Sequence, residues 1–116
     1  MKVYIAGKIT GDPDYKKKFA AAARSLENAG LAVLIPSVLP EGMTPADYMR
    51  ICVAMIDTAD LVVFLDDYQQ SKGAMLEHAW CEYTGKEYIC VKLADLITGN
   101  VYRITEVEEH HAEVQD

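Results

Sequence analysis

Residues 61–85 read LVVFLDDYQQSKGAMLEHAWCEYTG, and this stretch decides the fold. It opens with an uninterrupted apolar run, Leu61–Leu65, which is typical of a strand in a parallel sheet covered on both faces. The pattern after this run predicts a helix, and Ser71 and Gly73 form the turn at which that helix begins. In open α/β sheets ligands bind outside the carboxyl ends of the strands. Glu77 lies about one helical turn beyond this position, so its carboxylate is a candidate for chemistry.

Working outward, three more short apolar runs predict strands, namely Val3–Ala6, Leu31–Ile35 and Tyr88–Val91. The segments between the strands predict helices. Their expected buried positions are Tyr15, Phe19, Ala22 and Leu26 in the first, Tyr48, Ile51, Cys52 and Met55 in the second, and Leu76, Ala79, Trp80 and Tyr83 in the third. Strands alternating with helices in this way require right-handed crossovers. The chain is therefore predicted to be an α/β protein, a three-layer α/β/α sandwich around a mostly parallel sheet of four to five strands.

The ends of the predicted helices carry recognisable signals. Pro13 is expected to open the first helix with Asp12 as its N-cap. The run 44–47, Thr-Pro-Ala-Asp, predicts the start of the second helix, and Gly85 predicts the end of the third. Beyond Lys92 the pattern is weaker: residues 101–104 predict a short fifth strand, and residues 106–116 a short helix or polar tail. A single domain is expected over residues 1–116.

The amino-acid composition argues against some classes of binding partner. The formal net charge of −7 argues against a duplex nucleic-acid partner, since such binders carry clustered basic residues. The one basic cluster, Lys16–Lys18, fits the solvated side of the first predicted helix. The three cysteines Cys52, Cys81 and Cys90 form no CxxC pair, which indicates free thiols in a reducing compartment. No apolar stretch approaches 18 residues. A cytoplasmic protein without membrane attachment is therefore expected.

Two loops are candidates for ligand binding. Gly7-Lys8-Ile9-Thr10-Gly11 follows the first strand, and its glycines permit close backbone approach to a ligand before a helix that offers free N–H groups to an anion. An ordinary tight turn explains this loop equally well. At the second loop, the Ser71 hydroxyl and the Gly73 amide are suited to a phosphate, and Glu77 to the role of nucleophile or general base. The alternative for Glu77 is a surface glutamate.

Other polar residues offer fewer indications. Asp66 and Asp67 follow the third strand and are expected either to face a ligand or to form a solvated loop. Tyr68 is placed to stack on a base or to pack half-exposed. His78 and the pair His110-His111 lack metal-ligand spacing, so no metal site is expected.

Several of these segments together resemble a known family. The segments Tyr4–Gly11, Ala59–Val63, Ser71–Glu77 and Gly85-Lys86 occur in the order seen in the nucleoside 2-deoxyribosyltransferase-like superfamily. The resemblance covers roughly residues 2–91. It is strongest to short phage and prophage members, and it extends to the 2′-deoxynucleoside 5′-monophosphate N-glycosidases.

The resemblance implies a five-stranded Rossmann-like sheet and attack on an N-glycosidic bond without a metal or organic cofactor. It places the catalytic glutamate at Glu77, the sugar-side tyrosine at Tyr4 and the 5′-phosphate contact at Ser71. A serine at this last position favours a nucleotide substrate, and the GKITG loop would complete the phosphate site. A homo-oligomer is also implied, because relatives build their sites across subunit contacts.

The sequence departs from that family at two positions. Cys52 stands where the hydrolases have an aspartate, and Thr10 where they have an arginine, although Lys8 is able to supply a positive charge. Asp66 or Asp67 is then expected to act as the acid. The expected function is cleavage of the N-glycosidic bond of 2′-deoxynucleoside 5′-monophosphates or nucleosides, by hydrolysis or by base transfer. The alternative is a nucleotide-binding or sensing module without turnover, which the Cys52 departure favours.

Overall fold

The centre of the protein is a sheet of four parallel strands in the order β2-β1-β3-β4. The computed structural model describes residues 1–115, with side chains up to residue 112. The strands are β1 (Lys2–Ala6), β2 (Ala32–Leu34), β3 (Leu61–Leu65) and β4 (Tyr88–Val91). β3 is buried along its whole length, as its continuous apolar sequence predicted.

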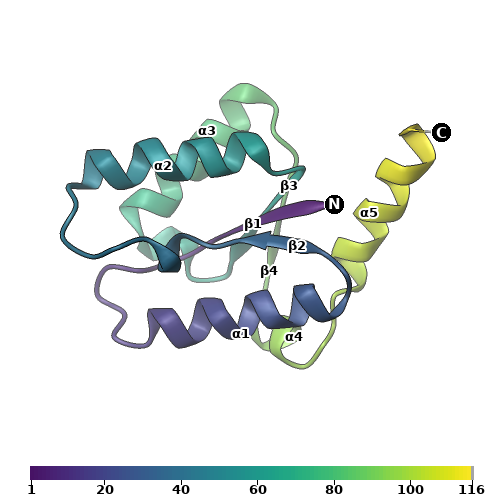
Figure 1. The fold of residues 1–116 in the computed structure, drawn as a ribbon, viewed down its shortest axis with the longest axis horizontal. Helices are drawn as coiled ribbons and strands as arrows, with labels where there is room; N and C mark the ends of the chain where they lie inside the picture. Colours follow the sequence, from purple (N-terminus) through teal and green to yellow (C-terminus); the bar gives the residue numbers. More distant parts are fainter. Residues whose placement is uncertain (116) are drawn as a thin grey trace.

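Helices cover both faces of the sheet (Figure 1). The helices are α1 (Tyr15–Asn28), α2 (Pro45–Thr58), α3 (Lys72–Thr84), α4 (Leu93–Ile97) and α5 (Tyr102–Gln115), with short 3-10 turns η1 (Pro36–Val38) and η2 (Tyr68–Gln70). α2 and α3 lie on one side of the sheet, and α1 and α4 lie on the other. The α/β/α sandwich expected from the sequence is therefore confirmed, with four strands and a Rossmann-like arrangement.

Each face of the sheet has its own apolar core. Alternate residues of β1 and β3 point to opposite faces, as the period of a strand requires. Val3, Ile5 and Val63 pack with α1, α4 and the start of α5. Tyr4 and Phe64 pack in the other core, with residues of α2 and α3. The polar groups of Tyr4, Cys52 and Glu77 lie in this second layer.

Two predicted helix ends are confirmed in detail. Thr44 and Asp47 form a reciprocal capping box at the start of α2: the Thr44 hydroxyl accepts from Asp47 N, and the Asp47 carboxylate accepts from Thr44 N. Gly85 follows α3 with φ +75°, the left-handed conformation that glycine adopts most readily. These local signals were readable because each depends on residues close together in sequence.

The predicted start of α1 was wrong by two residues. The helix begins at Tyr15, with Asp14 rather than Asp12 at the capping position. The Asp12 carboxylate instead accepts a hydrogen bond from Asp14 N and forms an ion pair with Lys18. Asp12 is thus held by a side chain six residues further along the chain, which favours a turn over residues 12–14.

The predicted fifth strand at residues 101–104 was also wrong. Tyr102–Ile104 form the first turn of α5, and Ile104 is buried against the core that contains α1. Arg103 donates a hydrogen bond to the carbonyl oxygen of Cys90 and so covers part of the β4 edge. Residue 116, the end of the predicted polar tail, lies outside the described residues.

Two predicted buried faces need correction. In α3 the buried residues are Ala74, Glu77 and Cys81, whereas Leu76 and Tyr83 are exposed. In α2 Cys52 is buried as predicted, whereas Ile51 is exposed. None of the helices within the described range has both the length and the hydropathy that a membrane span requires.

Candidate functional site at the β1–β3 edge

The strand order places the topological switch point between β1 and β3, because β2 lies on one side of β1 and β3 on the other. Ligands of open α/β sheets bind outside the strand ends at such a point. The loop after β1 is GKITG, and the loop after β3 contains Asp66 and Asp67. α3, which carries Glu77, begins directly after this second loop. The fold therefore brings both predicted ligand loops to one edge of the sheet.

Glu77 is buried in the layer between the sheet and helices α2 and α3. With 6% of its surface exposed, it is the most deeply buried charged residue within the described part of the chain. It lies beside the hydroxyl of Tyr4, which projects from β1, and the Cys52 thiol of α2 lies next to the same hydroxyl. The predicted pair of Glu77 and Tyr4 is therefore brought together, with Cys52 as a third member.

This trio is incompletely hydrogen-bonded. The Tyr4 hydroxyl is close enough to influence the pKa of both neighbours, yet Tyr4 Oη and Glu77 Oε2 make no hydrogen bond of good geometry within the described structure. The contact between the two side chains is therefore loose. Buried polar atoms in native proteins are nearly always paired, so two adjacent exceptions indicate a place where a ligand or water completes the network.

Burial controls the protonation of all three groups. It raises the pKa of Glu77 to about 7, and the nearby Tyr4 hydroxyl lowers that pKa by a smaller amount. Burial, followed by the charge of Glu77, raises the pKa of Tyr4 well above 10, so Tyr4 is a proton donor at neutral pH. Burial also raises the pKa of the Cys52 thiol, which makes it a weak acid. A carboxyl group that titrates near neutral pH is suited to nucleophilic or acid–base chemistry.

The GKITG loop is tied to the loop after β3. Asp67 Oδ1 accepts a hydrogen bond of 3.0 Å from Lys8 N. Asp67 Oδ2 lies 2.6 Å from Lys18 Nζ of α1. Asp66, next in sequence, accepts a 3.1 Å hydrogen bond from Leu93 N at the start of α4. The two carboxylates predicted as alternative acids are thus engaged in contacts with other segments.

The second segment predicted to bind a phosphate is at the start of α3. The Ser71 hydroxyl accepts a hydrogen bond of 3.1 Å from Ala74 N and so caps the helix. Gly73 is packed loosely: a Cβ placed on it would lie 3.9 Å from Ser71 Oγ and 4.0 Å from Met49 Cε. Backbone N–H groups at such a helix start favour anions.

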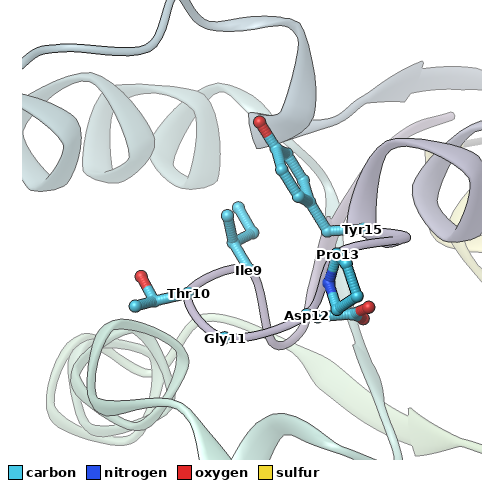
Figure 2. A pocket seen from close by; sticks show the side chains of 6 residues that line it. All are labelled: Ile9, Thr10, Gly11, Asp12, Pro13 and Tyr15. Carbon is cyan, nitrogen blue, oxygen red and sulfur yellow. The ribbon is translucent and has the colours of Figure 1, made fainter.

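An open pocket of about 460 Å³ lies beside the GKITG loop (Figure 2). Its lining is formed by Ile9, Thr10, Gly11, Asp12, Pro13 and Tyr15. Figure 2 shows Thr10 projecting from the tip of the loop, while Ile9 and Tyr15 extend toward a common side. Glu77 does not line this pocket. The Glu77 carboxyl group combines burial with a pKa raised to about 7, so it, rather than the pocket, is the candidate for chemistry.

Sequence reasoning missed the role of Lys18. Its side chain is only 9% exposed and joins the two loops, although it was assigned to a solvated basic cluster. The acids at positions 12 and 67 gave a signal for this contact, but their proximity depends on the fold. Tyr68 packs half-exposed, one of its two predicted alternatives, on the ring of His78, which also contacts Phe64 and Tyr88. No cluster of three or more potential metal ligands occurs among the described residues.

The fold and site define a Rossmann-like α/β domain with a buried carboxyl group beside the switch point of its sheet. Residues 1–90 match the family model described as Domain of unknown function (DUF4406), and the chain belongs to that family. The match ends within β4 and thus includes both loops, Tyr4 and Glu77. No curated protein matches the chain.

Proposed function

We propose that this protein cleaves the N-glycosidic bond of 2′-deoxynucleoside 5′-monophosphates, with Glu77 as the nucleophile. The observation that carries the proposal is the burial of Glu77 next to Tyr4, with an unpaired oxygen on each side chain. The pKa of Glu77 near 7 supports it, because a substantial fraction of the carboxyl group is then ionised at neutral pH. The resemblance to the nucleoside 2-deoxyribosyltransferase-like superfamily supplies the reaction class.

The proposed reaction has two steps. A Glu77 carboxylate oxygen attacks C1′ while the bond from C1′ to the base breaks, and the bonding electrons leave with the base nitrogen, which takes up a proton. Water then attacks C1′, which releases deoxyribose 5-phosphate and restores the carboxylate. In base transfer, a second base replaces this water. The Tyr4 hydroxyl is proposed to orient the Glu77 carboxylate toward C1′ of the sugar.

The proton for the leaving base is proposed to come from Asp66. Asp67 was the other predicted acid, but it is fixed by Lys8 and Lys18. Asp66 is exposed, and one of its oxygens contacts Leu93 N. The substitution Asp66→Asn is expected to slow base release more than Asp66→Glu.

The 5′-phosphate is proposed to bind between the GKITG loop and the start of α3. Gly7 to Gly11 would contribute backbone N–H groups and the Lys8 ammonium, while Ser71 and Gly73 would contribute the hydroxyl and amide at the helix start. Both segments follow strands that meet at the same edge of the sheet.

Base release from the four deoxynucleoside monophosphates, followed by chromatography, tests the function. The wild type is expected to release base, and Glu77→Gln to abolish that release. Glu82→Gln, which changes an exposed carboxyl group of the same helix, is the matched control. Adding a second free base to the reaction distinguishes hydrolysis from transfer.

A second candidate is a nucleotide-binding module without turnover. Two observations favour it: the weakly acidic Cys52 thiol contacts Tyr4 where the resemblance leads one to expect an acid, and the open pocket beside the GKITG loop does not include Glu77. Binding of a deoxynucleotide without base release, unchanged by Glu77→Ala, would support this candidate against the enzyme.

We also propose that the protein forms a homo-oligomer through α3. Met75, Leu76 and Tyr83 lie on the outer face of this helix and are 51%, 60% and 90% exposed. Leu76 and Tyr83, seven residues apart, share one stripe of the helix and Met75 lies beside it; exposed apolar patches of this kind mark interaction surfaces. Light scattering after size exclusion tests this, since Leu76→Lys is expected to yield the monomer and Lys17→Met to leave the assembly unchanged.

A further inference from the structure

The ammonium group of Lys18 is enclosed by three oxygen atoms from three parts of the chain. Lys18 Nζ lies 2.6 Å from the carbonyl oxygen of Lys8, 2.7 Å from Asp12 Oδ2 and 2.6 Å from Asp67 Oδ2. The Lys18 side chain is 9% exposed. A buried ammonium group is unfavourable unless it is fully paired, so this arrangement satisfies all three of its N–H donors.

These contacts join the loops on the two sides of the switch point. Asp67 uses its second oxygen to accept from Lys8 N, so a single carboxylate holds both the GKITG backbone and Lys18. Gly7 permits this approach. A Cβ on Gly7 would lie 3.0 Å from Asp67 Oδ1 and 3.1 Å from Leu65 Cδ1, which is closer than side chains normally pack.

The same contacts change the electrostatics of the loop. Asp12 and Asp67 would otherwise present two negative charges next to a site proposed for a phosphate dianion, and like charges at this distance repel. Lys18 lies directly against both carboxylates. It also occupies the Lys8 carbonyl oxygen, which would be a further source of repulsion. The Lys8 ammonium lies close to Gly11 of the same loop, about 4.0 Å from the position that a Cβ on Gly11 would take.

We propose that Lys18 is a positioning residue that makes the GKITG loop able to accept the 5′-phosphate. It does so by neutralising Asp12 and Asp67 and by fixing the Lys8 backbone across the switch point. This inference rests on the proposed function for the presence of a phosphate-bearing ligand. Lys18 itself makes its contacts to protein oxygens, and the ligand is left to Lys8 and the loop amides.

The test is the preference for phosphate measured by calorimetric titration. Each of the four deoxynucleosides and its 5′-monophosphate is titrated into the full chain carrying Glu77→Gln, so that no ligand is consumed. The ratio of the nucleoside Kd to the monophosphate Kd measures the contribution of the phosphate. Lys18→Met is expected to reduce this ratio by roughly tenfold or more, the scale of one hydrogen bond to a charged group, while the nucleoside Kd stays unchanged.

Two further variants complete the experiment. Lys18→Arg keeps the charge and is expected to restore most of the ratio, whereas Lys17→Met, at the neighbouring exposed lysine, is expected to leave it at the starting value. If Lys18→Met does not fold, as judged by circular dichroism, the double variant Asp12→Asn/Lys18→Met replaces it, because it removes one of the carboxylates left unpaired.

An unchanged ratio in folded Lys18→Met, or an equal loss of affinity for nucleoside and monophosphate, would overturn the proposal. So would a starting protein with no preference for the phosphate. Base release has no part in this titration. A wild-type protein that binds monophosphates preferentially but releases no base would therefore overturn the proposed function and leave the role of Lys18 supported.

Discussion

The burial of Glu77 predicts a specific dependence of stability on pH. Glu77→Gln replaces the carboxyl group with a neutral group of the same size, in a site where ionisation is unfavourable. The pKa of Glu77 is about 7 in the folded protein against an ordinary value of 4.5. Since one pKa unit corresponds to about 1.4 kcal/mol, full ionisation of buried Glu77 costs the folded state about 3 kcal/mol.

The sign follows from linkage. A group whose pKa is raised on folding contributes stability that is fully present below its unfolded-state pKa and is lost as the pH rises through its folded-state pKa. The wild type therefore loses this contribution between about pH 4.5 and pH 7, and Glu77→Gln does not. The free energy of unfolding of Glu77→Gln minus that of wild type is expected to increase by about 3 kcal/mol over this range.

Urea unfolding followed by circular dichroism at half-unit steps from pH 4.5 to pH 8.5 measures this difference. Other titrating groups contribute equally to both proteins and cancel. Glu82→Gln provides the comparison for loss of an exposed carboxyl group from the same helix. A difference between Glu77→Gln and wild type that stays constant with pH would refute the conclusion that Glu77 titrates in a desolvated site.

Three other substitutions test the surroundings of the site. Tyr4→Phe removes the hydroxyl that lowers the pKa of Glu77, so the pH at which stability is lost should move above 7, and an unchanged midpoint in the same urea series would contradict the contact. Gly7→Ala is expected to destabilise by roughly 1–3 kcal/mol because its Cβ would meet Asp67. Gly73→Ala, whose Cβ would make only ordinary van der Waals contacts, should stabilise α3 by roughly 0.5–1 kcal/mol in the same measurement, and equal effects at the two glycines would argue against the crowding.

The layer arrangement and several helix ends were predictable because they depend on local patterns. The uninterrupted apolar run of β3 indicated a strand covered on both faces, and Thr44 with Asp47 indicated a capping box. Both were confirmed. The segment 101–104 was misread because a short apolar run fits a strand or a helix equally well. Its neighbour Gly99, with φ +85°, ends α4 and allows the chain to turn into α5.

The buried face of α3 was harder to predict for a physical reason. Apolar residues lie on both sides of this helix: Leu76 and Tyr83 are on the outer side, while Trp80 packs partly buried against the inner core. Hydrophobicity alone therefore could not separate the buried face from the exposed one. The inner face contains Glu77 between Ala74 and Cys81, so the functional candidate itself interrupts the pattern that would have identified its own surroundings.

The contacts of Asp67 and Lys18 were beyond prediction from the sequence. They are 49 residues apart, and their 2.6 Å contact depends on the register between β1 and β3 and on the packing of α1. Sequence reasoning placed Asp67 correctly at the end of β3. It had no means of assigning the carboxylate to a lysine of α1 rather than to a ligand.

The most direct test of the central claim is base release from 2′-deoxynucleoside 5′-monophosphates as a function of pH. Wild-type kcat/KM is expected to increase with pH and to level off above about pH 7, as the Glu77 carboxyl group ionises, and Glu77→Gln is expected to release no base at any pH. Base release by Glu77→Gln at the wild-type rate would contradict the role of Glu77 as the nucleophile.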